Sequence, residues 1–308
     1  MTRIDQALRR ARDVEEVRAD APAATAPGDT LTYDPAAFSV EQPRRVGGRG
    51  SEGRQVERAG PPGTLSPFTR VVPSTAVGRH GRAEGERLIT AIDQADPTLD
   101  QFRSLAATLH HAQQDREIGT LTVTSAASGE GKTLVSANLA LTLSQSYNRR
   151  VLLIDADLRR PGLHQYFPVP SDAGLSGALG AIRDGAAVAV HEITPRLALL
   201  PAGRSLRDPV SLFSLDSMHR LVAAAAESFD WVILDAPPVG MLPDASLLSN
   251  LTDAVLLVVQ AGRVRYQLVQ RTVESLGADR IFGVVLNRVP EHDLVSSFGR
   301  DYYTPYRE

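Results

Sequence analysis

One stretch of the chain limits its possible folds more than any other. The run Thr120–Ser125 predicts a strand, and it leads through a glycine-rich turn directly into a helix predicted over Lys132–Ser146. In a strand–turn–helix unit of this kind, the N–H groups of the turn and the helix N-terminus together form an anion site. This stretch therefore predicts a phosphate-binding loop.

Apolar runs and helical patterns alternate along the following part of the chain. Several runs are apolar throughout, which is typical of parallel strands buried on both faces. Helices are predicted between them, notably over Pro209–Ser228 and Tyr266–Leu276. The alternation predicts an α/β fold, a doubly wound and mostly parallel sheet of the P-loop NTPase type, whose ligands bind at the carboxyl ends of the strands. Further strands are predicted over Arg150–Asp155, Leu197–Pro201, Trp231–Asp235, Ala254–Gln260 and Ile281–Asn287.

The residues before this domain follow a different pattern. From Ala21 to His80 the chain is dominated by Pro, Gly, Ala, Arg, Glu and Thr without any sustained period. Such a segment buries too little apolar surface to offset the entropy lost on ordering, so residues 1–82 are expected to be largely disordered or a linker. Residues 1–18 have helical spacing of apolar residues, which fits either a transient solvated helix or a short amphipathic docking helix.

The P-loop domain is expected to span residues 83–298. It is predicted to begin with a helix over Ala83–Ala95, ended by the Asp96-Pro97 pair, and a second helix that starts at Thr98 or Asp100. Residues 299–308 are expected to form a flexible tail that contains tyrosines.

Composition excludes several classes of function. The absence of cysteine excludes a disulfide scaffold, a thiolate metal site and a cysteine nucleophile. A net charge of −3 gives no strong field for nucleic acid, so no nucleic-acid partner is expected. The N-terminus has no apolar signal segment and no run of about twenty apolar residues occurs, so a cytoplasmic protein is expected.

The only lysine of the chain lies in the predicted phosphate loop. Lys132 is one of 33 basic residues, and the other basic residues are arginines. A compact ammonium suits a crowded phosphate site better than a planar guanidinium. Lys132 is expected to reach the β- and γ-phosphates of ATP, and the Thr133 hydroxyl to bind Mg²⁺. The loop is incomplete, because Ala126 stands where the usual pattern has glycine. The predicted nucleotide-binding residues are Ser128, Gly129, Glu130, Gly131, Lys132, Thr133, Leu134 and Asn287.

Acidic residues end two further strands. Asp155 and Asp157 lie on the same side of the chain as it leaves the sheet, where they could hold Mg²⁺ or accept a proton from an attacking hydroxyl. They could instead pair with Arg159 and Arg160. Asp235 closes another apolar run, and a single Asp in this position is the usual second metal ligand of phosphate-loop enzymes. Asp235 could instead be an acidic turn residue before the two prolines.

Two features near the C-terminus allow alternative interpretations. Asn287 ends the last predicted strand, where it could hydrogen-bond the adenine edge or cap a turn. Three of the seven tyrosines, Tyr302, Tyr303 and Tyr306, lie in the final polar residues. In a mobile tail they would be accessible phosphoacceptors, or their rings could pack onto the domain or a neighbouring subunit.

The blocks Thr124–Thr133, Asp155–Pro161 and Asp235–Pro238 resemble the nucleotide motifs of the bacterial tyrosine autokinases of capsular and exopolysaccharide biosynthesis. This resemblance covers the chain from about Asp100 to its end. It implies ATP-dependent phosphorylation of the C-terminal tyrosines in trans between subunits, with Mg²⁺ organised by Thr133, Asp155 and Asp235 and with Asp155 or Asp157 deprotonating the tyrosine. The other matching stretches are Gly174-Leu175-Ser176, Leu199–Gly203, Pro243-Asp244-Ala245 and Gly283–Val289.

The resemblance also implies partners. Many such kinases are fused to, or paired with, a two-span membrane protein that controls polysaccharide chain length. This chain is therefore expected to bind a membrane polysaccharide co-polymerase and to lie at the inner face of the plasma membrane. The family's assembly motif, Glu-x-x-Arg-x-x-Arg, falls on Asp100, Arg103 and Ala106, so homo-oligomer contacts are expected to be altered.

Two other functions fit parts of the sequence. A partitioning-type ATPase of the same superfamily carries an additional lysine early in the phosphate loop, which here would fall at Ala127. A nucleotide-binding scaffold would regulate the polysaccharide machinery without phosphorylating anything. The altered assembly motif and the few tyrosines favour such a scaffold, whereas the three acids at the strand ends favour a kinase.

Overall fold

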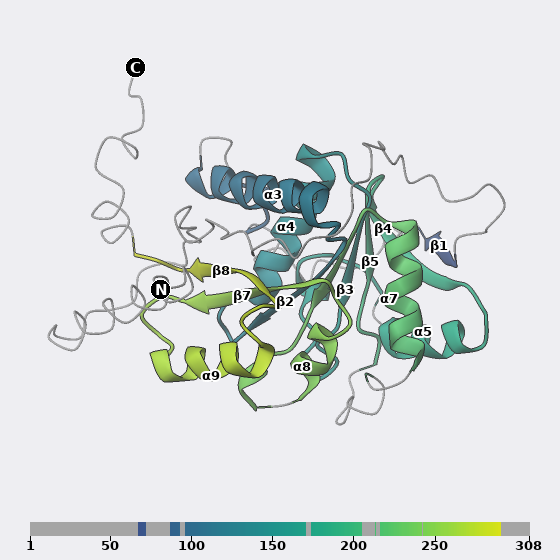
Figure 1. The fold of residues 1–308 in the computed structure, drawn as a ribbon. Helices are drawn as coiled ribbons and strands as arrows, with labels where there is room; N and C mark the ends of the chain where they lie inside the picture. The colour runs from purple at the N-terminus through teal and green to yellow at the C-terminus, as the bar shows by residue number, and fades with distance from the viewer. Residues whose placement is uncertain are drawn as a thin grey trace, which may run out of the picture.

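Figure 1 shows the chain as a computed structural model. The expected helix within residues 1–18, most of the expected linker and Tyr302, Tyr303 and Tyr306 lie outside the residues that the structure describes. Those residues are 67–71, 87–92, 96–170, 174–204, 213, 216–241 and 243–290.

The described residues form an eight-stranded sheet with the strand order β1-β4-β5-β3-β6-β2-β7-β8. Every neighbouring pair is parallel except β4 and β5, which are antiparallel. The sheet confirms the predicted doubly wound architecture, with β2, the strand before the glycine-rich turn, between β6 and β7. The strands are β1 (Phe68–Val71), β2 (Thr120–Ser125), β3 (Val151–Asp155), β4 (Val188–Thr194), β5 (Leu197–Leu200), β6 (Trp231–Asp235), β7 (Ala254–Gln260) and β8 (Ile281–Asn287).

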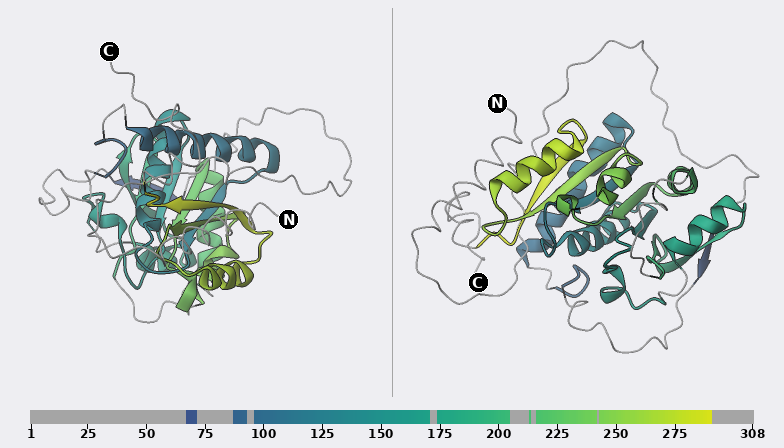
Figure 2. Two further views of the ribbon diagram at one scale, coloured as in Figure 1. Left: turned by 90° about the vertical axis from the view of Figure 1, so that its left-hand side faces the viewer. Right: turned by 90° about the horizontal axis from the view of Figure 1, so that it is seen from below.

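Helices cover both faces of the sheet (Figures 1 and 2). Helices α3 and α4 pack with one face of the sheet in one hydrophobic cluster, and α5 and α7 pack with the opposite face in another. Helix α9 packs on β7 and β8. The helices are α3 (Pro97–Arg116), α4 (Lys132–Ser146), α5 (Leu175–Arg183), α7 (Asp216–Ser228), α8 (Asp244–Ser249) and α9 (Tyr266–Leu276), with short 3₁₀ turns at Leu163–Gln165 and Val239–Met241.

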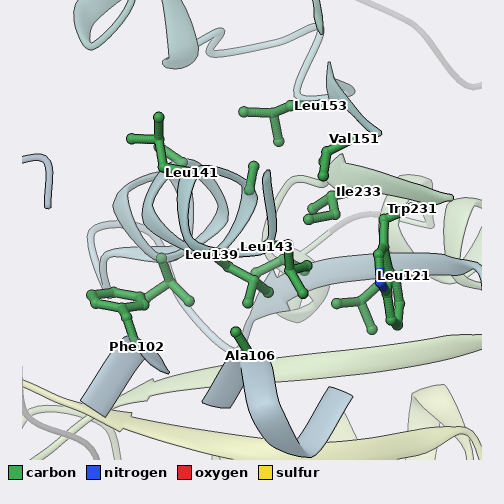
Figure 3. Packing of buried hydrophobic residues seen from close by; sticks show 14 of the residues in the cluster. Phe102, Ala106, Leu121, Leu139, Leu141, Leu143, Val151, Leu153, Trp231 and Ile233 are labelled. Atoms are coloured by element: carbon green, nitrogen blue, oxygen red, sulfur yellow. The ribbon is translucent and has the colours of Figure 1, made fainter. Parts of the chain in front are cut away.

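The core beneath α4 holds together the strands that carry the candidate site. Phe102 and Ala106 of α3 lie on the side of α4 that carries Leu139, and Trp231 of β6 lies beside Leu121 of β2 in the same hydrophobic cluster (Figure 3). Trp231 is completely buried, and all residues of β2, β3 and β6 are buried as well. Burying one large apolar side chain contributes about 1.5–3 kcal/mol, so this packing holds the three strands and α4 in a fixed relation.

The structure differs from the prediction at the start of the domain. Residues 87–92 form turns rather than part of the helix predicted over Ala83–Ala95. The buried Asn138 side chain accepts a hydrogen bond from the Ile89 N–H at 3.0 Å and donates one to the Arg87 carbonyl at 3.3 Å. These bonds satisfy backbone groups that a helix would pair within itself.

The Asp96-Pro97 pair begins a helix. The Asp96 carboxylate caps α3 by accepting a hydrogen bond from the Thr98 N–H at 2.8 Å, and Pro97 occupies the first turn. Proline is favoured there because the first helical N–H groups have no intrahelical acceptor. The pair was predicted to end a preceding helix, whereas in the structure it begins α3.

Four elements were not predicted: β1, β4, α5 and α8. Strand β1 lies inside the segment expected to be a linker, and it pairs in parallel with β4 from Phe68 opposite Val188 to Val71 opposite His191. Arg70 in β1 also donates to the Pro195 carbonyl at 2.8 Å. In the part of the chain that the structure describes, no helix combines the length and apolar character needed to cross a bilayer.

Candidate active site

A cavity of about 520 Å³ opens where the loops after β2, β3 and β6 meet. Because these strands are parallel, their carboxyl ends lie at the same edge of the sheet, which is where ligands bind in such folds. Six of the eight predicted nucleotide-binding residues line the cavity, and Asp157 lines it too. The lining residues are Arg87, Ser128, Gly129, Gly131, Lys132, Thr133, Leu134, Asp157, Arg159, Arg160, Gly162, Gln165, Tyr166, Pro237, Pro238 and Arg288.

The backbone of the phosphate loop depends on glycine at two positions. Gly129 and Gly131 have φ angles of 86° and 92°, which residues with a side chain rarely adopt. A Cβ atom on Gly131 would lie only 2.1 Å from Asn287 Nδ2. The loop therefore needs glycine at 131 both for its backbone angle and for the close approach of β8.

Lys132 contacts two acidic residues from neighbouring strands. Its ammonium lies 3.0 Å from Asp157 Oδ2 and 3.7 Å from Asp235 Oδ1, and its side chain is only 11% exposed. Burial disfavours the ammonium, but the negative charges of Asp235 and Asp157 outweigh this effect and raise the pKa of Lys132. The side chain therefore remains a charged ammonium at the floor of the cavity.

Asp155 and Asp235 are buried neighbours on β3 and β6. Asp155 Oδ2 accepts hydrogen bonds from the N–H groups of Gly162 and Leu163, both at 3.0 Å. Burial, with the nearby charge of Asp235, raises the pKa of Asp155 to about 7. Burial also raises the pKa of Asp235, although the Lys132 ammonium opposes this.

One oxygen of each carboxylate has no hydrogen-bond partner among the described residues: Asp155 Oδ1 and Asp235 Oδ2. The Thr133 side chain hydrogen-bonds to Asp235. Mg²⁺ in phosphate sites is usually held by one or two carboxylates together with phosphate oxygens and waters. The two unpartnered oxygens and the Thr133 hydroxyl fit such an ion. In the described ranges no group of three or more His, Cys, Asp or Glu residues could hold a metal ion without a phosphate.

Asp157 differs from Asp155 because it faces the cavity. Its Oδ1 accepts a hydrogen bond from the Arg160 N–H at 3.0 Å, while Oδ2 contacts Lys132. The alternative that both acids pair with the side chains of Arg159 and Arg160 is wrong for Arg159. That guanidinium binds Asp244 of α8 at 2.6 Å.

The pair of Arg159 and Asp244 is a site feature that sequence reasoning missed. The Asp244 carboxylate is completely buried, whereas the Arg159 side chain is 24% exposed and lines the cavity. Asp244 lies in the Pro243-Asp244-Ala245 block, which contributes to the family resemblance but for which the sequence indicated no role. A buried acid that starts a short helix fixes the guanidinium in place beside the cavity.

The two predicted nucleotide-binding residues that do not line the cavity are Glu130 and Asn287. The Glu130 carboxylate accepts hydrogen bonds from the N–H groups of Ala127 and Gln260, and burial raises its pKa. The buried Asn287 side chain donates from Nδ2 to the Glu130 carbonyl at 2.7 Å. Both side chains thus contact the protein backbone, and contact of Asn287 with adenine stays a prediction.

Comparison with known proteins shows similarity along most of the chain. Residues 121–303 match the family model described as "CobQ/CobB/MinD/ParA nucleotide binding domain". The chain is 31% identical to "Tyrosine-protein kinase CpsD" of Streptococcus agalactiae serotype Ia over 209 residues, which are 67% of this chain and 88% of that protein. It is also 31% identical to "Tyrosine-protein kinase YwqD" of Bacillus subtilis over 206 residues, 65% of this chain and 86% of that protein.

A solved structure agrees with these relatives. The kinase domain of the Escherichia coli tyrosine kinase ETK superposes on this chain with a TM-score of 0.59 and 29% sequence identity, and the match covers 67% of this chain and 80% of that domain.

Proposed function

Because the chain belongs to the CobQ/CobB/MinD/ParA nucleotide-binding family and, within it, to the bacterial tyrosine-protein kinases, we propose that it transfers the γ-phosphoryl group of ATP to protein tyrosines and so regulates capsular or exopolysaccharide biosynthesis and export. The observation that best supports this proposal is the pairing of Lys132 with Asp157 at 3.0 Å beside the two unpartnered carboxylate oxygens of Asp155 and Asp235. The Lys132 ammonium and the Asp157 carboxylate thus line one cavity, and the proposed metal ligands Asp155 and Asp235 lie buried at the same edge of the sheet.

The phosphate loop supplies binding and orientation. The loop N–H groups and the start of α4 would hold the β-phosphate, while Lys132 would leave Asp157 for the γ-phosphate. Thr133, Asp155 and Asp235 would hold Mg²⁺, which neutralises charge on the transferring phosphoryl group. Phosphoryl transfer depends mostly on such positioning and charge neutralisation.

Asp157 is our assignment for the proton acceptor. When Lys132 turns to the phosphates, the Asp157 carboxylate loses its cationic partner and stays at the cavity wall. It would accept the proton of the tyrosine hydroxyl while the tyrosine oxygen bonds to the γ-phosphorus and the bond from that phosphorus to the leaving ADP breaks. Asp155 is less suited, because its one oxygen without a partner is buried beside Asp235.

Matched variants distinguish the proposed roles of Asp155 and Asp157. Asp157→Asn should bind magnesium-ATP nearly as well as the parent but lose at least about 100-fold in the rate of transfer. Asp155→Asn should instead weaken Mg²⁺ binding. If Asp157→Asn retained the parent rate, the assignment of the proton acceptor would be wrong.

The proposed acceptors are Tyr302, Tyr303 and Tyr306, phosphorylated between subunits. On α3, the exposed Asp100 and Arg103 form an ion pair at 3.0 Å, whereas Ala106 is completely buried in the core. We therefore expect any self-association through α3 to lack a second arginine contact. A membrane polysaccharide co-polymerase remains the proposed partner, recruiting the kinase to the inner face of the plasma membrane.

The direct test is incubation of the purified chain with ATP labelled in its γ-phosphate and Mg²⁺. The parent should become labelled on tyrosine, and a variant with Phe at 302, 303 and 306 should not. Lys132→Met is the matched inactive control. Binding of ATP without any label, even with the co-polymerase present, would favour the regulatory scaffold. Loss of recruitment on deleting residues 1–66, which leaves β1 in place, would support a tether in that segment.

A further inference from the structure

Glu130 occupies an unusual place for a charged residue in a phosphate loop. It lies between Gly129 and Gly131, which line the cavity, yet the residue is only 1% exposed. Its Oε1 accepts a hydrogen bond from the Gln260 N–H at the end of β7 at 3.0 Å, and its Oε2 accepts one from the Ala127 N–H at the start of the loop. Both carboxylate oxygens are therefore used inside the protein.

The backbone of the same residue is held by the next strand. Asn287 at the end of β8 donates from Nδ2 to the Glu130 carbonyl at 2.7 Å. The same Nδ2 atom would lie 2.1 Å from a Cβ atom on Gly131. Residue 130 is thus fixed by β7 through its side chain and by β8 through its carbonyl, so three short contacts determine the path of the loop.

A carboxylate in this place opposes binding of a triphosphate, because like charges repel. Arg263 offsets part of this charge, since its guanidinium lies 3.5 Å from the position of a Cβ atom on Gly129 and its charge favours ionised Glu130. The Glu130 carboxylate also contributes no lining to the cavity. Direct contact with phosphate therefore does not account for the residue.

We infer that Glu130 is a positioning residue, which holds the loop between residues 127 and 131 in its phosphate-binding shape by tying it to the end of β7. This inference rests on the proposed function, because the shape matters through ATP binding. Backbone N–H groups that already point into the cavity avoid the entropy cost of ordering the loop around the ligand. The contribution of Glu130 should therefore appear in ATP affinity.

The test compares three single variants of the full chain. Glu130→Ala removes both acceptors and should raise the Kd of magnesium-ATP, and the KM for ATP, by about tenfold or more. Its kcat at saturating ATP should stay within about threefold of the parent, because the bound triphosphate restores the loop. Glu130→Gln keeps one acceptor oxygen and should have an intermediate affinity.

Asp253→Ala is the matched control for stability. The Asp253 carboxylate accepts hydrogen bonds from the N–H groups of Gly119 and Thr120 at 2.9 and 2.8 Å, at the opposite end of β2 from the loop. Its removal costs two hydrogen bonds to backbone and one to the Thr120 hydroxyl, so it should also lower the temperature of thermal unfolding. Its affinity for magnesium-ATP should equal that of the parent.

Calorimetric titration with magnesium-ATP and transfer of label to tyrosine give the two measurements. Weaker ATP binding in Glu130→Ala but not in Asp253→Ala supports the inference. Equal affinity of Glu130→Ala and the parent overturns it, even if the variant is less stable. If Glu130→Ala does not fold, Glu130→Gln decides in the same way. A parent that binds no ATP overturns the proposed function together with this inference.

Discussion

Proton binding at the buried pair of Asp155 and Asp235 should control the affinity for Mg²⁺. The pKa of Asp155 is about 7, raised by burial and by the charge of Asp235. A metal ion binds the deprotonated carboxylate, so protons compete with Mg²⁺ below this pH. The deprotonated fraction falls from about nine tenths at pH 8 to about one tenth at pH 6, which predicts a loss of about tenfold in Mg²⁺ affinity.

The assay is a titration of Mg²⁺ into the protein saturated with a non-hydrolysable ATP analogue, at several pH values between about 6 and 8. Binding of Mg²⁺ by the analogue alone, measured at each pH, is subtracted. Asp157→Asn keeps the buried pair and should keep the pH dependence, whereas Asp155→Asn should lose it. A corrected affinity that changes by less than about twofold over this range would refute the reasoning.

The same pKa predicts the stability of the protein without nucleotide. The pKa of Asp155 in the folded state lies above its ordinary value, so the folded protein binds a proton that the unfolded chain releases. Stability should consequently decrease as the pH rises through about 7, and saturating magnesium-ATP should remove most of this dependence. Chemical denaturation at a series of pH values measures both effects.

Three further predictions concern individual side chains. Lys132→Arg should lose label transfer by at least about 100-fold, as Lys132→Met does, because a planar guanidinium does not fit the place of an ammonium in the loop; equal rates for Lys132→Arg and the parent would contradict this. Gly131→Ala should lower the free energy of unfolding by about 1–3 kcal/mol in urea. Adding Asn287→Ala should restore only the part of this loss that comes from the close contact with Asn287, because the unfavourable backbone angle at residue 131 remains. Asp244→Ala should cost about 1–3 kcal/mol in the same assay, less than a fully buried pair because Arg159 can reach solvent; no loss would mean that the pair contributes nothing to stability.

The sequence allowed most of the sheet to be predicted, since β3, β5, β6, β7 and β8 consist mostly of apolar residues. Strands β2, β6, β7 and β8 have the predicted bounds, and β3 and β5 differ from them by one residue at one end. Strand β4 escaped prediction because its second half is polar and half-exposed, and α5 because two glycines interrupt its nine residues. Strand β1 has only four residues and follows a proline- and glycine-rich stretch, so no local period marks it.

The site was predictable to the extent that it follows from topology. Parallel strands bring Lys132, Asp155, Asp157 and Asp235 to one edge of the sheet, and the structure places all four there. The direction of the Glu130 side chain and the pairing of Arg159 with Asp244 did not follow. Glu130 and Gln260 are 130 positions apart in the sequence, and Arg159 and Asp244 are 85 positions apart. No spacing pattern in a single sequence indicates contacts between residues so far apart.

Strand β1 determines where the protein can be shortened. A chain that begins at residue 83 would look complete by the sequence pattern, but it would strip away the parallel neighbour of β4 from Val188 to His191. The N–H and C=O groups of β4 that pair with β1 would then be unpaired at an exposed edge of the sheet. Such an edge strand can pair with strands of other molecules. Shortened chains that begin at or before Pro67 should stay monodisperse at concentrations where chains that begin at residue 83 aggregate.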